Sequence, residues 1–148
     1  MNFFDFSDNL NNYSAVKLLD DLQVQLEKTP EATDLIKQQW NEGIGSDGKI
    51  LGRYSKATEI ITNGRKVAGT TYDIFDTGET RQKLTLFGFQ KSGDIDFLFE
   101  SDSQAMPELL QRIPADILLG YTEKDKDKFT AIAVEKAIIL LNTNLKLR

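Results

Sequence analysis

The sequence contains no cysteine and no histidine. The absence of cysteine excludes disulfide bonds and thiolate chemistry. The two usual zinc ligands are therefore both missing, and so is the commonest general base. An enzyme of this composition would have to use carboxylate, lysine, serine, threonine or tyrosine side chains. We expect no metal site, no cofactor and no catalytic activity.

Long apolar runs are absent as well. The longest, Ala137–Leu141, has about five residues, whereas a bilayer span needs roughly 18. No basic residue precedes the apolar residues of the opening Met1–Phe6, which argues against a secretory signal. The net charge of −5 gives no general attraction to nucleic acid. We therefore expect no membrane partner and no specific nucleic-acid binding, in a protein that begins near Met1.

A chain of 148 residues has the usual length of a single domain with one core. Apolar residues at helical spacing predict helices from about Ala15 to Lys28 and from Pro30 to Gly43, with Ser14 and Thr29 as N-caps. A last helix is predicted from about Glu123 to Asn142, after the capping-box pattern Thr122–Asp125. Its buried face would consist of Phe129, Ile132, Ala133, Lys136, Ala137, Leu140 and Leu141.

Strands are predicted in the middle of the chain. Thr71–Phe75 has β-branched and aromatic content, and Ile95, Phe97 and Phe99 alternate with more polar positions. Between them, Leu84–Phe89 reads as a strand whose alternation slips at Leu86–Phe87, which suggests a bulge near Gly88. Short helices are expected from Ser55 through Ile61 and from Ser103 to Ile113, the second followed by a packed connector over 113–120.

This order of elements predicts a single α+β domain over residues 13–148, with a small antiparallel sheet packed against N-terminal and C-terminal helices. Residues 1–12 form a polar opening that contains three aromatic side chains, Phe3, Phe4 and Phe6. We expect this N-terminal aromatic arm to pack on its own domain or on a neighbouring subunit.

Two glycine-containing turns resemble ligand loops without having the required spacing. The stretch 43–48 lacks the alternating acids and final acidic residue of a calcium loop. The turn Gly64-Arg65-Lys66 lacks the spacing and preceding strand of a phosphate-binding loop. We interpret the second turn as an exposed basic turn.

Asp76-Thr77-Gly78 admits two interpretations. In an aspartic protease such loops bring two carboxylates together, and a single copy would require a homodimer. The alternative is a structural turn in which Asp76 bonds to nearby backbone amides and Gly78 adopts a conformation that other residues resist. The stretch Ile50–Arg53 is similar to the hydrophobic-hydrophobic-Gly-Arg motif of retropepsin-like proteases. In those enzymes the motif follows the catalytic loop, but here it precedes Asp76. We favour the structural turn.

Several small motifs occur in an order that resembles a known family. They include Trp40, the turn 45–48, Leu51-Gly52-Arg53-Tyr54-Ser55, the basic turn at 65–66, and the hydrophobic-Asp-Thr-Gly at 75–78. Together with the stretch 117–122 before a terminal helix, they resemble bacteriophage virion-morphogenesis proteins, specifically tail-completion or neck proteins of the head-to-tail connector. Arg81 and Lys83 depart from the leucine and serine common after the Asp-Thr-Gly of many such proteins.

The resemblance implies a non-enzymatic structural subunit of the virion, assembled in the host cytoplasm. Its partners would be other copies of itself in a ring, through which DNA could pass, and the portal, adaptor or tail proteins. The candidate interface residues are Phe3, Phe4, Phe6, Arg53 and Tyr54. A small adaptor or regulatory domain that binds another protein is the alternative, with the aspartic protease as a third possibility.

Overall fold

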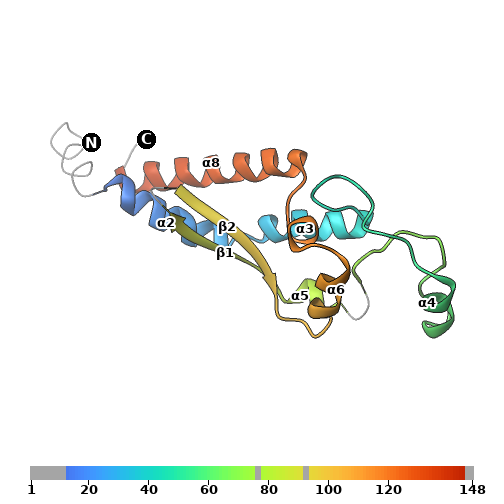
Figure 1. Cartoon of the computed structure of the whole chain (residues 1–148). Coiled ribbons are helices and arrows are strands. Elements are labelled where there is room, and N and C mark those ends of the chain that lie inside the picture. The colour runs from blue at the N-terminus through green and yellow to red at the C-terminus, as the bar shows by residue number, and fades with distance from the viewer. Residues whose placement is uncertain (1–12, 76–77, 92–93, 146–148) are drawn as a thin grey trace.

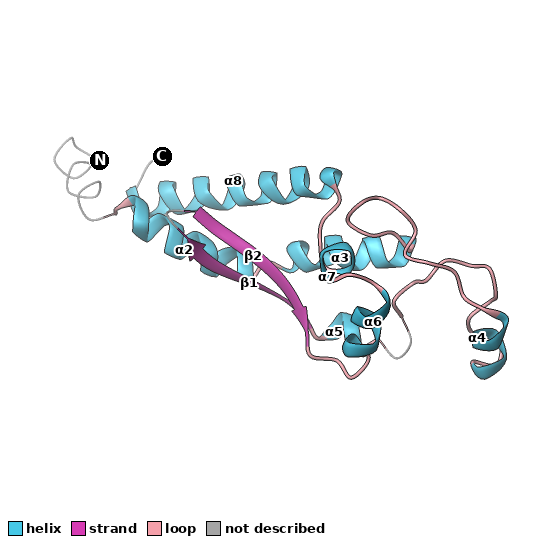
Figure 2. Ribbon diagram, viewed as in Figure 1, coloured by secondary structure: helices cyan, strands magenta, loops and turns pink. Residues whose placement is uncertain are grey.

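The structure, a computed structural model, describes residues 13–75, 78–91 and 94–145. These residues form seven helices and one antiparallel hairpin, which confirms the predicted α+β class (Figures 1 and 2). In chain order the elements are α2 (Ala15–Glu27), α3 (Pro30–Glu42), α4 (Lys56–Ile61), α5 (Glu79–Gln82), β1 (Leu84–Lys91), β2 (Asp94–Ser101), α6 (Met106–Arg112), α7 (Ala115–Leu118) and α8 (Glu123–Leu145).

Helices α2 and α8 lie side by side and cover the hairpin from one side (Figure 1). Both begin where the sequence places a cap: Ser14 Oγ accepts the Lys17 N–H at 3.2 Å, and Thr122 Oγ1 accepts the Asp125 N–H at 3.2 Å. The predicted buried face of α8 is half-buried at all of its positions. Helical periodicity alone therefore identified which side of the last helix faces the core.

Helix α3 begins at Pro30 and ends before Gly43, which has a φ of +69°. Its buried face carries Ala32, Ile36, Gln39 and Trp40. The Trp40 indole N–H donates to the Leu118 carbonyl at 2.9 Å, and the Tyr121 hydroxyl donates to the Ala32 carbonyl at 2.6 Å. These bonds attach α3 to the segment that connects α7 with α8.

The hairpin pairs β1 with β2 in one continuous register, from Leu84 opposite Ser101 to Lys91 opposite Asp94. The predicted bulge near Gly88 is therefore wrong. Leu86 and Phe99 face the core, whereas Phe87 and Leu98 are about half exposed on the opposite face. The alternation of apolar and polar residues looks interrupted in the sequence because Phe87 and Phe89 occupy exposed positions of β1. A pattern of apolar residues predicts such positions to be buried.

Gly88 lets helix α2 approach β1 closely. A Cβ at this position would lie 2.6 Å from Cγ of Gln23 and 3.0 Å from the Phe97 ring. The Gln23 amide donates to the Gly88 carbonyl and the Glu27 carboxylate accepts its N–H, both at 2.7 Å. The glycine thus serves helix packing on a regular strand.

The core lies between α3, the inner face of the hairpin and the segment after α6. Phe99 packs edge-on against Tyr121 with ring centroids 4.9 Å apart, and Phe97 packs edge-on against Phe129 of α8 at 5.3 Å. The residues that form this cluster are Ala32, Ile36, Trp40, Ile74, Leu84, Leu86, Phe99, Met106, Ile113, Leu118 and Tyr121.

Residues 53–71, which we call the projection, extend away from this core and carry α4 at their far end (Figure 1). A single antiparallel bridge between Arg53 and Thr71 closes its base. The predicted strand Thr71–Phe75 is wrong, because Thr71 is its only position in a bridge and Ile74 turns the chain with a φ of +44°. Strand-forming composition did not suffice without a neighbouring strand to complete the pairing.

The predicted helix over 103–113 is present as the shorter α6, and the connector after it contains the single turn α7. None of the helices in the described ranges has the length and apolar character needed to cross a bilayer.

Candidate functional site

A pocket of about 360 Å³ lies between the projection, including its helix α4, and the body of the protein. Its walls come from the projection, from the chain leading to α5, and from α6. Apolar and aromatic side chains dominate them, with contributions from Tyr54, Ile61, Tyr72, Phe75, Leu109 and Ile113. A pocket of this size and lining has the general character of a small-ligand or side-chain binding site.

Three residues that line this pocket, Tyr54, Lys66 and Phe75, bind the Asp73 carboxylate. Its Oδ1 accepts hydrogen bonds from the Tyr54 hydroxyl at 2.7 Å, the Lys66 ammonium at 2.6 Å and the Phe75 N–H at 3.2 Å. The Lys66 side chain is only 11% exposed, and it also donates to the Phe75 carbonyl. One carboxylate therefore connects both sides of the projection to the loop that follows it.

Two pKa values reflect this arrangement. Partial burial pushes the pKa of Asp73 upward, but the hydrogen bonds from Lys66 and Tyr54 outweigh it, so this pKa lies below its usual value. Burial and the hydrogen bond to Asp73 raise the pKa of Tyr54. At neutral pH the site therefore holds an ionised carboxylate and a neutral phenol. An acid with a lowered pKa is poorly suited to general acid or base catalysis near pH 7.

Arg81 of α5 also binds the loop that contains Asp73 and Ile74. Its guanidinium donates to the backbone carbonyls of Asp73 and Ile74 and to the Asn41 side chain of α3. It also lies over the Phe75 ring, 5.1 Å from the centroid, where a cation is attracted to the aromatic face. Burial lowers the pKa of Arg81, opposed by the Asp73 charge.

Ile74, between these contacts, has a φ of +44° although it is β-branched and only 7% exposed. Such a residue disfavours the left-handed region, so its backbone is strained. Arg81 donates to the Asp73 and Ile74 carbonyls and Lys66 donates to the Phe75 carbonyl, and these bonds keep the chain in this conformation.

The charged side chains that line the pocket are Arg65, Lys66 and Arg112, all of them cations. Arg112 pairs with Glu108 at 2.7 Å on the exposed side of α6. Lys66 is likewise paired, with Asp73 at 2.6 Å, so the pocket offers a mainly apolar surface to a ligand. The threonine hydroxyls nearby are engaged in structural bonds, as when Thr80 pairs with Ser103 at 2.9 Å.

The predicted interface residues Arg53 and Tyr54 separate in the structure. Arg53 is exposed and its guanidinium donates to the Gly69 carbonyl at 2.6 Å, across the base of the projection. Tyr54 points into the pocket and binds Asp73. Phe3, Phe4 and Phe6 lie outside the described residues.

Of the predicted structural turn, Asp76 and Thr77 also lie outside the described residues. Gly78 directly precedes α5 and has a φ of +84°, a conformation that favours glycine. In the described ranges the only sheet is the two-stranded hairpin, whereas the retropepsin-like proteases considered above are almost all β. This architecture counts against the protease. Cleavage of a peptide library that Asp76→Asn abolishes in a folded protein would restore it.

The prediction of a merely exposed basic turn at 64–66 is wrong for Lys66, whose side chain is largely buried against Asp73. Sequence reasoning also missed the roles of Asp73, Ile74 and Arg81. The sequence did single out Arg81, because Arg81 departs from the residue that is common after the Asp-Thr-Gly of the family that the chain resembles. Asp73 and Lys66 carried none, because their pairing depends on how the projection folds back.

Comparison with known proteins adds no relative: no protein-family model matches the chain, and neither the curated proteins nor the solved structures yield a match. Among the described residues, no group of acidic side chains has the arrangement of a metal site.

Proposed function

We propose that this protein is a non-catalytic structural subunit that joins other protein subunits, as a neck or tail-completion protein of a bacteriophage virion. The virion role comes from the sequence resemblance. The observation that supports assembly is the end of the projection, where Ile60 is 75% and Ile61 81% exposed. These are the most exposed large apolar side chains of the described residues.

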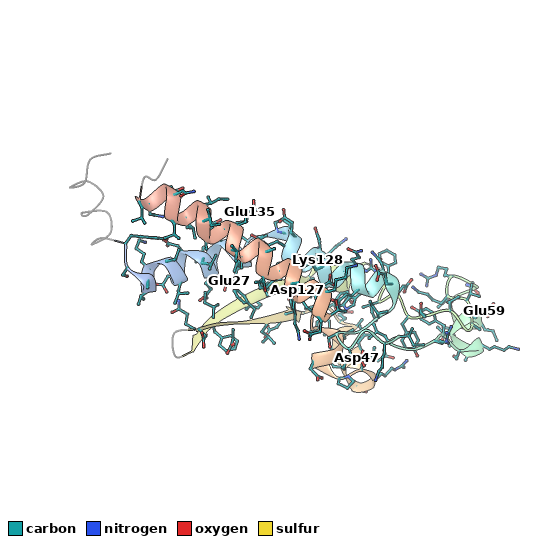
Figure 3. All side chains as sticks on the ribbon, turned by 90° about the horizontal axis from the view of Figure 1, so that it is seen from above. Glu27, Asp47, Glu59, Asp127, Lys128 and Glu135 are labelled. Atoms are coloured by element: carbon teal, nitrogen blue, oxygen red, sulfur yellow. The ribbon has the colours of Figure 1, made fainter. Side chains whose placement is uncertain are left out.

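The projection is suited to reach a neighbouring subunit. It extends beyond the body in two perpendicular views, with Glu59 marking its far end in Figure 3. Internal bonds stiffen it, among them the Glu59 carboxylate accepting the Ala68 N–H at 3.0 Å. Burying both isoleucines against a partner would contribute about 3 to 6 kcal/mol.

A projection that docks on a different surface of the next copy gives a head-to-tail contact, and such contacts close into rings when the rotation permits. In this proposal the ring joins portal or adaptor proteins to the tail in the virion, and DNA passes through it. The subunits assemble in the host cytoplasm.

The test compares two matched double variants. Ile60→Ser with Ile61→Ser removes the apolar end of the projection, and Ile138→Ser with Ile139→Ser removes two half-exposed isoleucines of α8. Light scattering and negative-stain electron microscopy should show ring particles for the unaltered protein and for the α8 variant, and monomers for the projection variant. An unaltered protein that remains monomeric and does not join head or tail particles would refute the proposal.

A small adaptor domain is the second candidate, and the mainly apolar pocket between the projection and α6 favours it. Such a pocket would take an apolar side chain of a partner protein. Binding of a peptide with such a side chain that Leu109→Ser abolishes would support this function, and neighbouring genes for portal, capsid or tail proteins would favour the virion role.

A further inference from the structure

The two strands of the hairpin have different outer edges. On β1, the N–H and C=O of Gly88 both point to α2, where Glu27 and Gln23 bind them at 2.7 Å each. The Gln90 side chain also donates to Asp20 of α2 at 2.5 Å. Side chains of α2 therefore occupy the outward backbone groups of β1 at Gly88, and Glu27 marks this contact in Figure 3.

The register then determines which backbone groups of β2 point outward. Phe97 is opposite Gly88, so this is a pair whose N–H and C=O groups point away from each other. The same holds two residues away on each side, at Ile95 and Phe99. Within the described part of the chain, these outward groups form no hydrogen bond to another element. The edge of β2 is thus available to a further strand.

The exposed face beside this edge combines apolar and acidic side chains. Phe87, Phe89 and Leu98 are each nearly half exposed, and Phe87 is directly opposite Leu98. On β2 itself the exposed side chains of Asp94, Asp96 and Glu100 lie on this same face, together with Leu98. A hollow of about 580 Å³ continues this face at the end of β2, with Met106, Leu110 and Leu119 in its walls.

We propose that the free edge of β2 binds an extended segment of another protein in which lysine or arginine alternates with apolar residues. The segment adds a third strand to the hairpin, and its basic side chains lie beside the acids of β2. Its apolar side chains on the opposite face of the new strand lie toward Ile95 and Phe97. Main-chain hydrogen bonds would supply affinity, and the alternating side chains would supply specificity.

Charge distinguishes this partner from a second copy of the same chain. If β2 paired with itself about Phe97, Asp94 would stand opposite Glu100 of the other copy. Like charges directly opposite each other destabilise a sheet. The acids therefore disfavour self-pairing and favour a basic strand.

The experiment uses the full chain and a synthetic heptapeptide in which lysine and valine alternate. There are two control peptides. In the first, every lysine is replaced by glutamate. In the second, alternate backbone nitrogens on the edge that would pair are methylated. Binding is followed by fluorescence anisotropy of labelled peptide and by amide NMR shifts. We expect only the unmodified basic peptide to bind, with the largest amide shifts at Ile95, Phe97 and Phe99.

A charge-reversal pair locates the contact. Asp96→Lys with Glu100→Lys should weaken peptide binding by about tenfold or more, whereas Asp127→Lys on the exposed side of α8 should leave it within about twofold. Equal binding of the N-methylated peptide or of the charge-reversed protein would overturn the proposal. So would a dimer of the unaltered protein whose protected amides are those of β2.

Discussion

At the scale of single residues, Gln39 shows how a buried polar side chain organises this fold. It is 2% exposed on α3, and its amide donates to the Gly120 carbonyl and accepts the Thr122 N–H, both at 2.9 Å. Gln39 lies beside Trp40 on the buried face of α3, and its partners come from a distant part of the chain. Those partners lie about 80 residues later, at the entry to α8.

Gln39→Leu should lower the free energy of unfolding by about 2 to 4 kcal/mol, because it leaves two backbone groups unpaired at nearly constant volume. Urea denaturation followed by fluorescence of Trp40, the only tryptophan, measures this. Gln38→Leu is the control, since the exposed Gln38 amide bonds only the Glu42 side chain. It should change stability by less than about 0.5 kcal/mol. Equal midpoints for both variants would contradict the role of Gln39.

Asp73 gives a prediction on pH dependence. Its pKa is lowered in the folded state, so its contribution to stability is present above the unfolded pKa, near 3.8, and is lost as pH falls through the lower folded value. Asp73→Asn should therefore destabilise the protein at neutral pH, and the difference from the unaltered protein should shrink below about pH 4. Because the Asp73 side chain is 40% exposed, the effect is modest.

Urea midpoints measured from acidic to neutral pH check this expectation. Asp96→Asn serves as the control, because it makes the same change at an exposed carboxylate of β2. A difference for Asp73→Asn that is independent of pH would show that its charge does not stabilise the site.

At the scale of elements, packing of helices on strands decides features that local pattern misreads. The regular strand β1 looked interrupted because Phe87 and Phe89 are exposed while Gly88 lies under α2. Conversely, Thr71–Phe75 looked like a strand but turns at Ile74 to place Asp73 beside Lys66. In both cases the neighbour across the fold, rather than the local composition, determines the conformation.

Gly88→Ala should destabilise the protein by about 1 to 3 kcal/mol, because the added methyl group overlaps Gln23 and pushes α2 away from β1. Thermal denaturation in a double-mutant cycle with Gln23→Ala tests the cause. The cost of Gly88→Ala should be smaller in the Gln23→Ala background, since the overlapping side chain is gone. A cost that is equal in both backgrounds would place the strain elsewhere.

At the scale of the whole molecule, the body and the projection have different roles. The body contains the core and is fastened by the bonds from α3 to the α7–α8 connection. The projection adds little to that core and carries the exposed Ile60 and Ile61 at its far end. A molecule of this shape is suited to joining neighbours, as proposed above.

Deletion of residues 1–12 should leave the domain folded and weaken assembly, because the described residues 13–145 already contain a buried core and the deleted part carries Phe3, Phe4 and Phe6. The urea midpoint of the truncated chain should equal that of the full chain, while light scattering shows fewer large particles. A truncated protein that completes particles normally would contradict the assignment of an interface to this arm.

Local patterns in the sequence predicted helices α2, α3, α4, α6 and α8, the caps Ser14 and Thr122, both strands of the hairpin and the α+β class, because periodicity and capping are local properties. They did not predict α5, and the Thr29 side chain makes no capping bond. The buried face of α8 and the ends of α3 were also predicted. Folding of the whole chain brings Lys66, Asp73 and Arg81 together beside one pocket, strains Ile74 and leaves the edge of β2 open. Those features depend on contacts between segments far apart in the chain. The free energy of each segment's conformation is set there by what packs against it, and not by its own residues alone.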